Sequence, residues 1–265
     1  MPVGMLIDTT KCILCRLCEV ECHKFYELKD KRFAGTDDAP ELDAYHYVVL
    51  QAHQVPYYDR TQVIGVSKRC LHCFSPACAS VCPVGALHKE PNGAVVWEEG
   101  KCIGCRYCQN ACPFDIPKFE WDEPWPKISK CIFCNDRKLA VGENPVCFDV
   151  CPTKAIRFGE RADMIALAHE RIQNEPDKYY DHIYGEHEAG GTAVMYISSV
   201  APEEIGFIEV EKELYPPLTR EFLSKIPLEI SAIALFLTGT YLFRTRREAK
   251  FKAEALQQPS QEDRG

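Results

Sequence analysis

The longest apolar stretch of the chain is residues 226–243, near the carboxyl end. As a helix this stretch would rise about 27 Å, close to the minimum for crossing a bilayer. Glu229 lies near its start, and no charge follows between Ile230 and Phe243. A buried or amphipathic helix is the alternative, but residues 230–243 show no polar face, so we predict a single transmembrane helix.

Basic residues gather on the carboxyl side of this stretch. Those that follow it are Arg244, Arg246, Arg247, Lys250 and Lys252, whereas only Arg220 and Lys225 closely precede it. By the positive-inside rule, the carboxyl end is expected in the cytoplasm and the rest of the chain on the periplasmic side of the inner membrane. The polar tail, residues 244–265, is expected to be disordered.

Shorter patterns ahead of this segment predict an α+β fold. Strands are predicted at residues 5–8, 45–51 and 193–198, and a helix at residues 160–173. Asn92-Gly93 lies between two apolar runs and predicts a β-hairpin of residues 86–89 and 94–97.

Four cysteine motifs repeat along the chain and use all 16 of its cysteines. Their members are Cys12, Cys15, Cys18 and Cys22; Cys70, Cys73, Cys78 and Cys82; Cys102, Cys105, Cys108 and Cys112; and Cys131, Cys134, Cys147 and Cys151. The third motif has the ferredoxin spacing C-x2-C-x2-C-x3-C-P, in which three cysteines hold one [4Fe–4S] cluster and the fourth ligates another. The repeat predicts four [4Fe–4S] clusters, with every cysteine an iron ligand and no open iron site.

Two other uses of the cysteines are weaker. A disulfide framework suits short secreted domains, and four copies of closely spaced thiols would staple a 265-residue chain poorly. Structural zinc takes two separate pairs of ligands, so a third cysteine and a distant Cys-Pro would be surplus. A zinc-stapled scaffold would be colourless and free of iron.

A basic residue stands before the first cysteine of each motif. These residues are Lys11, Arg69, Lys101 and Lys130. A cation beside a four-thiolate cluster favours the more negative, reduced state and raises the reduction potential, but solvated surface charges fit the pattern equally well. Both interpretations stay open. His72, between Cys70 and Cys73, could tune or ligate a cluster, but it is expected to be an exposed bystander.

Residues 25–69 form an insertion between the first two motifs. It begins with turn residues, namely Gly35, Asp37, Asp38 and Pro40. Its length predicts a surface feature, which either meets a partner or simply covers the domain.

Composition and motifs exclude some classes of function. The net charge of −8 argues against a nucleic-acid partner. The sequence has no Ser/His/Asp set, phosphate-binding glycine loop or CxxCH haem motif, so no catalytic residue is predicted and the chain is not expected to be an enzyme alone. Cys12 follows Met1 too closely for a signal peptide, so export would depend on a partner's signal. Trp97, Trp121 and Trp125 are expected to pack in the core rather than to relay electrons.

The motifs and the apolar segment resemble the four-cluster electron-transfer subunits of membrane-bound respiratory oxidoreductases. This family includes the formate dehydrogenase β subunit, its dimethyl sulfoxide reductase equivalent and the iron–sulfur partner of membrane-bound [NiFe]-hydrogenases. The resemblance is strong from Cys12 to Cys151. It continues through Tyr184-Gly-Glu-His-Glu-Ala-Gly-Gly-Thr to the apolar segment, and residues 105–118 are most similar to the hydrogenase partner.

This resemblance implies two tandem ferredoxin-like units with nested pairing, the first motif with the fourth and the second with the third. The implied cluster ligands are Cys12, Cys15, Cys18 and Cys151 for cluster 1; Cys22, Cys131, Cys134 and Cys147 for cluster 2; Cys70, Cys73, Cys78 and Cys112 for cluster 3; and Cys82, Cys102, Cys105 and Cys108 for cluster 4. We expect the cluster domain at residues 1–160, a connector at 161–225, the transmembrane helix at 226–243 and the tail at 244–265.

The resemblance also implies the function. Electrons would pass between a catalytic subunit of molybdopterin or nickel–iron type and an integral quinone-reactive or cytochrome b subunit. Flow toward quinone fits formate or hydrogen oxidation, whereas a molybdopterin reductase would use the reverse direction. The alternative class is a self-standing, soluble polyferredoxin, against which the apolar segment argues.

Overall fold

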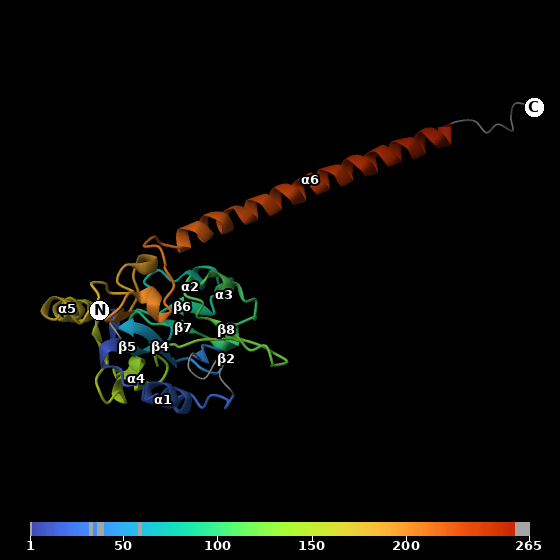
Figure 1. The fold of residues 1–265 in the computed structure, drawn as a ribbon. Coiled ribbons are helices and arrows are strands. Elements are labelled where there is room, and N and C mark those ends of the chain that lie inside the picture. The colour runs from blue at the N-terminus through green and yellow to red at the C-terminus, as the bar shows by residue number, and fades with distance from the viewer. Residues whose placement is uncertain (1, 32–33, 36–39, 58–59, 258–265) are drawn as a thin grey trace, which may run out of the picture. The chain divides into compact units, whose positions relative to one another are not determined.

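The computed structural model describes residues 2–31, 34–35, 40–57 and 60–257. The chain divides into two units, Met1–Thr219 and Arg220–Gly265, and the first contains every cysteine. The helices and strands (Figure 1) are β1 (Val3–Asp8), α1 (Leu17–Phe25), β2 (Ala34–Gly35), β3 (Pro40–Glu41), β4 (Val49–Tyr57), β5 (Arg60–Lys68), α2 (Ala77–Ser80), β6 (Leu87–Lys89), β7 (Val95–Trp97), α3 (Tyr107–Ala111), β8 (Lys118–Phe119), β9 (Ile128–Ser129), α4 (Val146–Asp149), β10 (Ile156–Glu160), α5 (Arg161–Asn174), β11 (Val194–Ile197) and α6 (Pro216–Gln257). Short 3-10 helices lie at Thr9–Lys11, Glu99–Lys101, Leu139–Val141, Glu188–Gly190 and Pro202–Ile205.

Strand β1 is the middle strand of a three-stranded sheet. It pairs antiparallel with β10 and parallel with β11. Because successive strand residues point to opposite faces, Leu6 packs with Met164 of α5, whereas Met5 and Ile7 belong to the core that contains cysteines. The strands predicted at residues 5–8 and 193–198 and the helix predicted at 160–173 are confirmed within one or two residues at their ends.

The insertion forms a long antiparallel hairpin, β4 with β5. The strand predicted at residues 45–51 is wrong at its start, because β4 begins at Val49. The carboxylate of Asp43 accepts a hydrogen bond from the Tyr45 N–H at 2.7 Å and lies 2.8 Å from Nδ1 of His46, which holds these residues in a turn. The sequence pattern does not predict β5, since its apolar residues do not alternate and Gly65 interrupts them.

The β4–β5 hairpin completes the core of the first unit. Its buried side chains are Val49, Leu50, Val55, Ile64 and Val66. The Glu19 carboxylate of α1 accepts the N–H of Leu50 at 2.8 Å and so ties the hairpin to the first motif. The expected surface segment is therefore an ordered hairpin that covers the core with one face and leaves Val63 on the other face exposed. The expected contact with a partner stays a prediction. Two of its expected turn residues, Asp37 and Asp38, lie outside the described residues.

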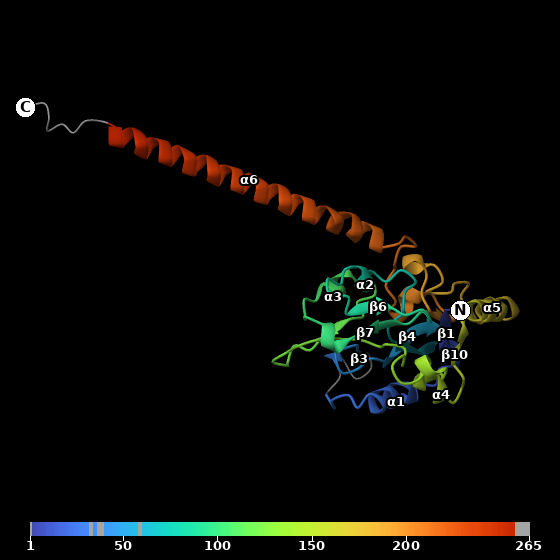
Figure 2. The ribbon, with the colours of Figure 1, turned by 180° about the vertical axis from the view of Figure 1, so that it is seen from behind.

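Four short cysteine-bearing helices pack in two pairs. Helix α1 packs against α4, and α2 packs against α3. In Figures 1 and 2 the two pairs lie on opposite sides of β4. The predicted hairpin is confirmed as β6 paired with β7, and Gly93 supplies the positive φ of 98° that its turn requires. Helices of the first and fourth motifs thus lie together, as do those of the second and third.

The prediction that the tryptophans pack in the core holds only for Trp97 of β7, which packs against the buried cluster that includes Leu87 and Ile128. Trp121 and Trp125 are 66% and 86% exposed in the first unit. Trp121 instead packs edge-on against Phe119 and lies 5.0 Å from the Arg106 guanidinium, a cation–π arrangement. It lies in the loop between the two-residue strands β8 and β9.

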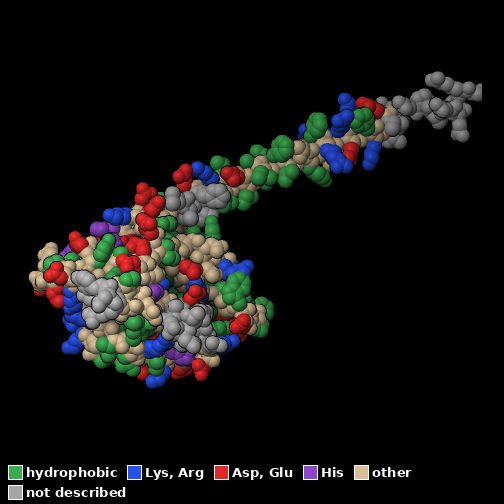
Figure 3. Space-filling model, in the orientation of Figure 1, with side chains coloured by type: hydrophobic (Ala, Val, Ile, Leu, Met, Phe, Trp, Pro, Cys, Tyr) green, Lys and Arg blue, Asp and Glu red, His purple; other side chains and the backbone are tan. Residues whose placement is uncertain are grey.

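Helix α6 forms most of the second unit. Its segment Ser224–Glu254 is long and apolar enough to cross a membrane. Figure 3 shows apolar side chains along this helix and basic ones toward its carboxyl end. The expectation of a disordered tail is wrong for residues 244–257, because the helix continues through them and Arg244 and Glu248 form an ion pair one turn apart at 2.8 Å. The expected disordered end, residues 258–265, lies outside the described residues.

Adjacent residues of β5 test the burial of the insertion. Ile64 is 3% exposed and Val63 is 50% exposed. We expect Ile64→Ala to lower the free energy of unfolding by about 2–5 kcal/mol, because it leaves a cavity, and Val63→Ala by about 0.5 kcal/mol. Denaturant unfolding followed by circular dichroism measures both. Equal effects would contradict the placement of the hairpin in the core.

Candidate iron–sulfur sites

Cysteines from different motifs meet around three cavities of the first unit. The first cysteine group is Cys12, Cys15, Cys18 and Cys151. The third group is Cys70, Cys73, Cys78 and Cys112. The fourth group is Cys82, Cys102, Cys105 and Cys108. Each cavity is lined by three thiols of one motif and one thiol of another. Among the described residues, no three His, Cys, Asp or Glu side chains are gathered for a single metal ion.

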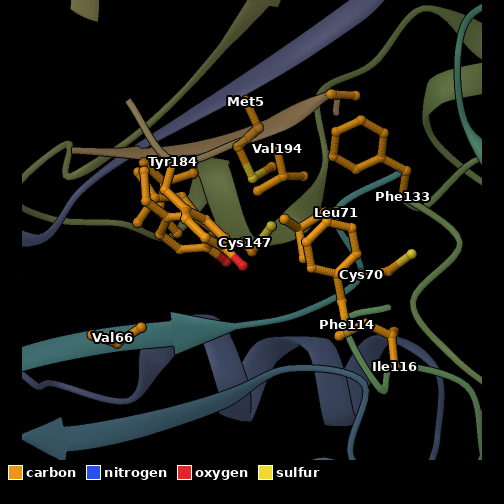
Figure 4. Close-up of a cluster of buried hydrophobic side chains, with 14 of the residues drawn as sticks. Met5, Val66, Cys70, Leu71, Phe114, Ile116, Phe133, Cys147, Tyr184 and Val194 are labelled. Atoms are coloured by element: carbon orange, nitrogen blue, oxygen red, sulfur yellow. The ribbon is translucent and has the colours of Figure 1, made fainter. Parts of the chain in front are cut away.

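The remaining four cysteines form the second group: Cys22, Cys131, Cys134 and Cys147. Burial, and then the thiols of the other three members, raise the pKa of Cys22 well above its ordinary value, so these four side chains are neighbours. Figure 4 shows Cys147 among the apolar side chains of the core, together with Cys70 of the third group.

Strand pairing positions the cysteine that joins each loop from elsewhere. Antiparallel pairing of β1 with β10 sets Ile7 opposite Ile156, and the N–H of Asp8 donates to the Ala155 carbonyl at 2.8 Å. This pairing carries Cys151 to the loop that begins at Cys12. The β6–β7 hairpin does the same for Cys82 and Cys102, since the N–H of Glu98 donates to the carbonyl of Ala86 at 2.9 Å.

The four groups adjoin one another in numerical order. Burial has the largest effect on the pKa of Cys18 and raises it. Arg69 and Ser67 lower this pKa, and the Cys147 thiol of the second group raises it. Burial and the Cys70 thiol of the third group raise the pKa of Cys131 to about 12. Burial and thiols that include Cys108 of the fourth group raise the pKa of Cys78. These pairs place the first group beside the second, the second beside the third and the third beside the fourth.

The loops that supply three cysteines share a left-handed backbone position. The residue before the second cysteine of each motif has a positive φ: Leu14 (57°), His72 (50°), Gly104 (67°) and Phe133 (63°). Glycine adopts this region freely, so the other three are held there by their surroundings, as is common at functional sites. In the first and third motifs Arg16 and Arg106 are left-handed as well. Such turns expose backbone N–H groups and form anion-binding concavities.

The basic residues before the four motifs fall into two classes. Lys11 and Lys101 lie toward the surface and pair with Asp8 (3.9 Å) and Glu98 (2.8 Å). Arg69 and Lys130 are buried, at 1% and 2% exposure. The Lys130 ammonium donates to the carbonyls of Val95 and Cys131 and lines the cavity of the third group. The surface-charge interpretation therefore describes the outer pair, and the potential-raising interpretation fits the inner pair.

His72 is fully buried, so the expectation of an exposed bystander is wrong. Its ring stacks on Phe133 of the second group with centroids 4.3 Å apart, although its backbone belongs to the third group. Nδ1 accepts the N–H of Val95 at 3.0 Å, which leaves the proton on Nε2. The sequence does not indicate this burial, because the residues beside Cys70 and Cys73 include both polar and apolar ones.

Buried donors near these cavities fit an anionic group. In the part of the chain that the structure describes, Nε2 of His72 and Nε of Arg69 are buried without an acceptor. An unsatisfied buried donor costs about 1–3 kcal/mol, and an unpaired buried cation costs more. Cluster sulfurs accept such hydrogen bonds, and thiolates are its ligands. The cysteine groups, the orphaned N–H groups and the buried cations together fit a [4Fe–4S] group.

Strand β5 and the residue that follows it contribute side chains that the motifs do not reveal. Gly65, Ser67 and Arg69 follow one another at every second position. A Cβ on Gly65 would lie 2.8 Å from Sγ of Cys12 and 2.9 Å from Leu14 Cδ2, so only glycine lets the strand approach this loop. The Ser67 hydroxyl lies 3.3 Å from Sγ of Cys18. Only the isolated glycine in an apolar run could have indicated this close approach.

Gly65 provides a test of the first group. We expect Gly65→Ala to displace the Cys12 thiol and to remove roughly a quarter of the bound iron, because one of four [4Fe–4S] groups loses its cradle. Gly100→Ala is the matched control, since a Cβ there meets nothing within 4 Å. Iron content and visible absorption of the two purified variants are compared. Full iron content in Gly65→Ala would contradict the assignment of this cavity.

Comparison with known proteins supports iron–sulfur chemistry. The family model for a 4Fe–4S dicluster domain matches residues 61–161. A protein of Nitratidesulfovibrio vulgaris is 39% identical over 266 residues, covering 96% of this chain and 71% of that protein. The Hydrogenase-2 operon protein HybA of Escherichia coli O157:H7 is 32% identical over 235 residues, covering 77% of this chain and 72% of that protein. The Formate dehydrogenase-O iron-sulfur subunit of Escherichia coli K12 is 36% identical over 201 residues, covering 74% and 66%.

These matches bear on the alternative uses of the cysteines. The matched dicluster domain contains the whole of the second, third and fourth motifs. All 16 cysteines are free thiols in the structure. The family match therefore supports [4Fe–4S] clusters as the cofactors of this chain, rather than disulfides or structural zinc.

Proposed function

This chain belongs to the family of [4Fe–4S] electron-transfer subunits of oxidoreductases, and we propose that it conducts electrons through four clusters between a catalytic subunit and a quinone-reactive membrane subunit. As a member of this family it carries electrons and is not an enzyme alone. The observation that carries the proposal is the meeting of three thiols from one motif with a fourth from another around each cavity. When bound, each [4Fe–4S] group supplies a reversible electron acceptor.

We assign one cluster to each cysteine group. The first and second groups would form one ferredoxin-like unit, and the third and fourth groups the other, with nested pairing of the motifs. The packing of α1 on α4 and of α2 on α3 supports this pairing. The cluster domain would comprise residues 1–160, followed by the connector at 161–225.

The two end groups are suited to exchange electrons with partners. Each contains one exposed cysteine, Cys15 in the first group and Cys105 in the fourth. An isoleucine beside each loop, Ile13 or Ile103, is also exposed. Apolar surface next to a cluster lets a partner subunit exclude water and approach closely. We propose that one end faces the catalytic subunit and the other faces the membrane subunit.

The names of the relatives suggest the reaction served. They include a formate dehydrogenase iron-sulfur subunit and a hydrogenase operon protein, so the catalytic partner would be of molybdopterin or nickel–iron type. Residues 226–243 of α6 would cross the inner membrane once and anchor the complex. The basic residues after this span would hold the carboxyl end in the cytoplasm and leave the clusters on the periplasmic side.

Purification from native membranes tests the function. After a carbonate wash, we expect the protein to remain in the membrane pellet. Mild-detergent purification followed by mass spectrometry should recover it with a molybdopterin or nickel–iron subunit and a membrane subunit. Recovery of the iron-loaded protein alone, from the soluble fraction, would contradict the proposal and favour a self-standing polyferredoxin.

Cysteine variants test the nested pairing. Cys112 is the last cysteine of the third motif, but it lies with cysteines of the second motif, among them Cys78, in the third group. Cys112→Ser should therefore alter the same electron paramagnetic resonance signal as Cys78→Ser. The matched control is Cys108→Ser, which should alter a different signal. Spectra of the dithionite-reduced variants are compared with wild type. If Cys112→Ser matches Cys108→Ser, each motif holds its own cluster and the nested arrangement is wrong.

A further inference from the structure

Arg69 lies where three cysteine groups meet. Its backbone directly precedes Cys70 of the third group. Its Nη2 donates a hydrogen bond to Oγ of Ser67, and this hydroxyl lies 3.3 Å from Sγ of Cys18 in the first group. Its Nη1 donates to Sδ of Met5 at 3.6 Å, and Met5 packs in the same buried core cluster as Cys147 of the second group. The guanidinium therefore adjoins the first and second groups.

No carboxylate compensates this charge among the residues that the structure describes. The Arg69 side chain donates to Met5 Sδ at 3.6 Å and to Ser67, and its Nε has no acceptor. A fully buried cation without an anion is strongly unfavourable. The arrangement is favourable when an anionic cluster lies beside it. Lys101, by contrast, shares its charge with Glu98 near the surface.

The hydrogen bonds have a direction. Since Arg69 has only donors, Ser67 Oγ must accept from it, and the serine proton is then free to point at Cys18. A donor to a ligating sulfur stabilises negative charge on that sulfur. The guanidinium and the hydroxyl thus both stabilise negative charge at the first group.

We propose that Arg69 sets the reduction potentials of the clusters held by the first and second cysteine groups, raising both above the potential they would otherwise have. This inference rests on the proposed function. A four-thiolate [4Fe–4S] cluster is a dianion when oxidised and gains one negative charge on reduction, so a nearby fixed cation stabilises the reduced state more. The cations beside the loop of the fourth group, Lys101 and Arg106, are exposed, so solvent screens their charge.

The test is a redox titration of the full-length protein in detergent, followed by electron paramagnetic resonance. In Arg69→Gln we expect two of the midpoint potentials to fall, each by at least a tenfold change in the ratio of reduced to oxidised cluster, about 59 mV for one electron. Arg69→Lys retains the charge and should restore most of the shift. Lys101→Gln is the matched surface control and should move no potential by as much.

A second variant covers failure of Arg69→Gln to fold. Ser67→Ala keeps the cation and removes only the hydroxyl between Arg69 and Cys18, so one potential should fall. Unchanged midpoints in Arg69→Gln, or in Ser67→Ala where the first variant does not fold, would overturn the inference if all clusters are present. A wild-type protein without four clusters would instead overturn the proposed function.

Discussion

Each cysteine group needs a fourth thiol from outside its own three-cysteine loop, and this requirement organises the first unit. Pairing of β1 with β10 brings Cys151 to the Cys12 loop, and the β6–β7 hairpin brings Cys82 to the Cys102 loop. The helices that carry cysteines pack in the same two pairs. The short strands and helices of this unit thus position the thiols, and its main core cluster, which contains Cys70 and Cys147, packs against five further cysteines.

Burying anionic clusters imposes a second constraint, which the chain meets with fixed positive charge. Arg69 and Lys130 are buried without an Asp or Glu partner among the described residues, whereas Lys11 and Lys101 pair with acids near the surface. A cation buried inside a protein is tolerated when an anion lies beside it. The basic residue before each motif therefore has one of two physical roles, and its burial decides which.

Spacing alone predicted the motifs, the hairpin around Asn92-Gly93, helix α5 and the long apolar helix, because each depends on residues close together in sequence. Burial of the β4–β5 hairpin could not be predicted in this way, since Gly65, Ser67 and Arg69 matter only through contact with the distant first motif. The same limit explains the wrong expectations for His72, Trp121 and Trp125. Whether a side chain beside a cysteine is buried depends on what covers the loop, and the covering strands lie elsewhere in the chain.

We expect this one chain to hold four [4Fe–4S] clusters in adjoining sites. Native mass spectrometry of the anaerobically purified protein measures this directly. We expect its mass to exceed the mass of the polypeptide by that of four [4Fe–4S] groups. A smaller excess that persists after anaerobic reconstitution with iron and sulfide, or an excess that corresponds to zinc, would contradict it.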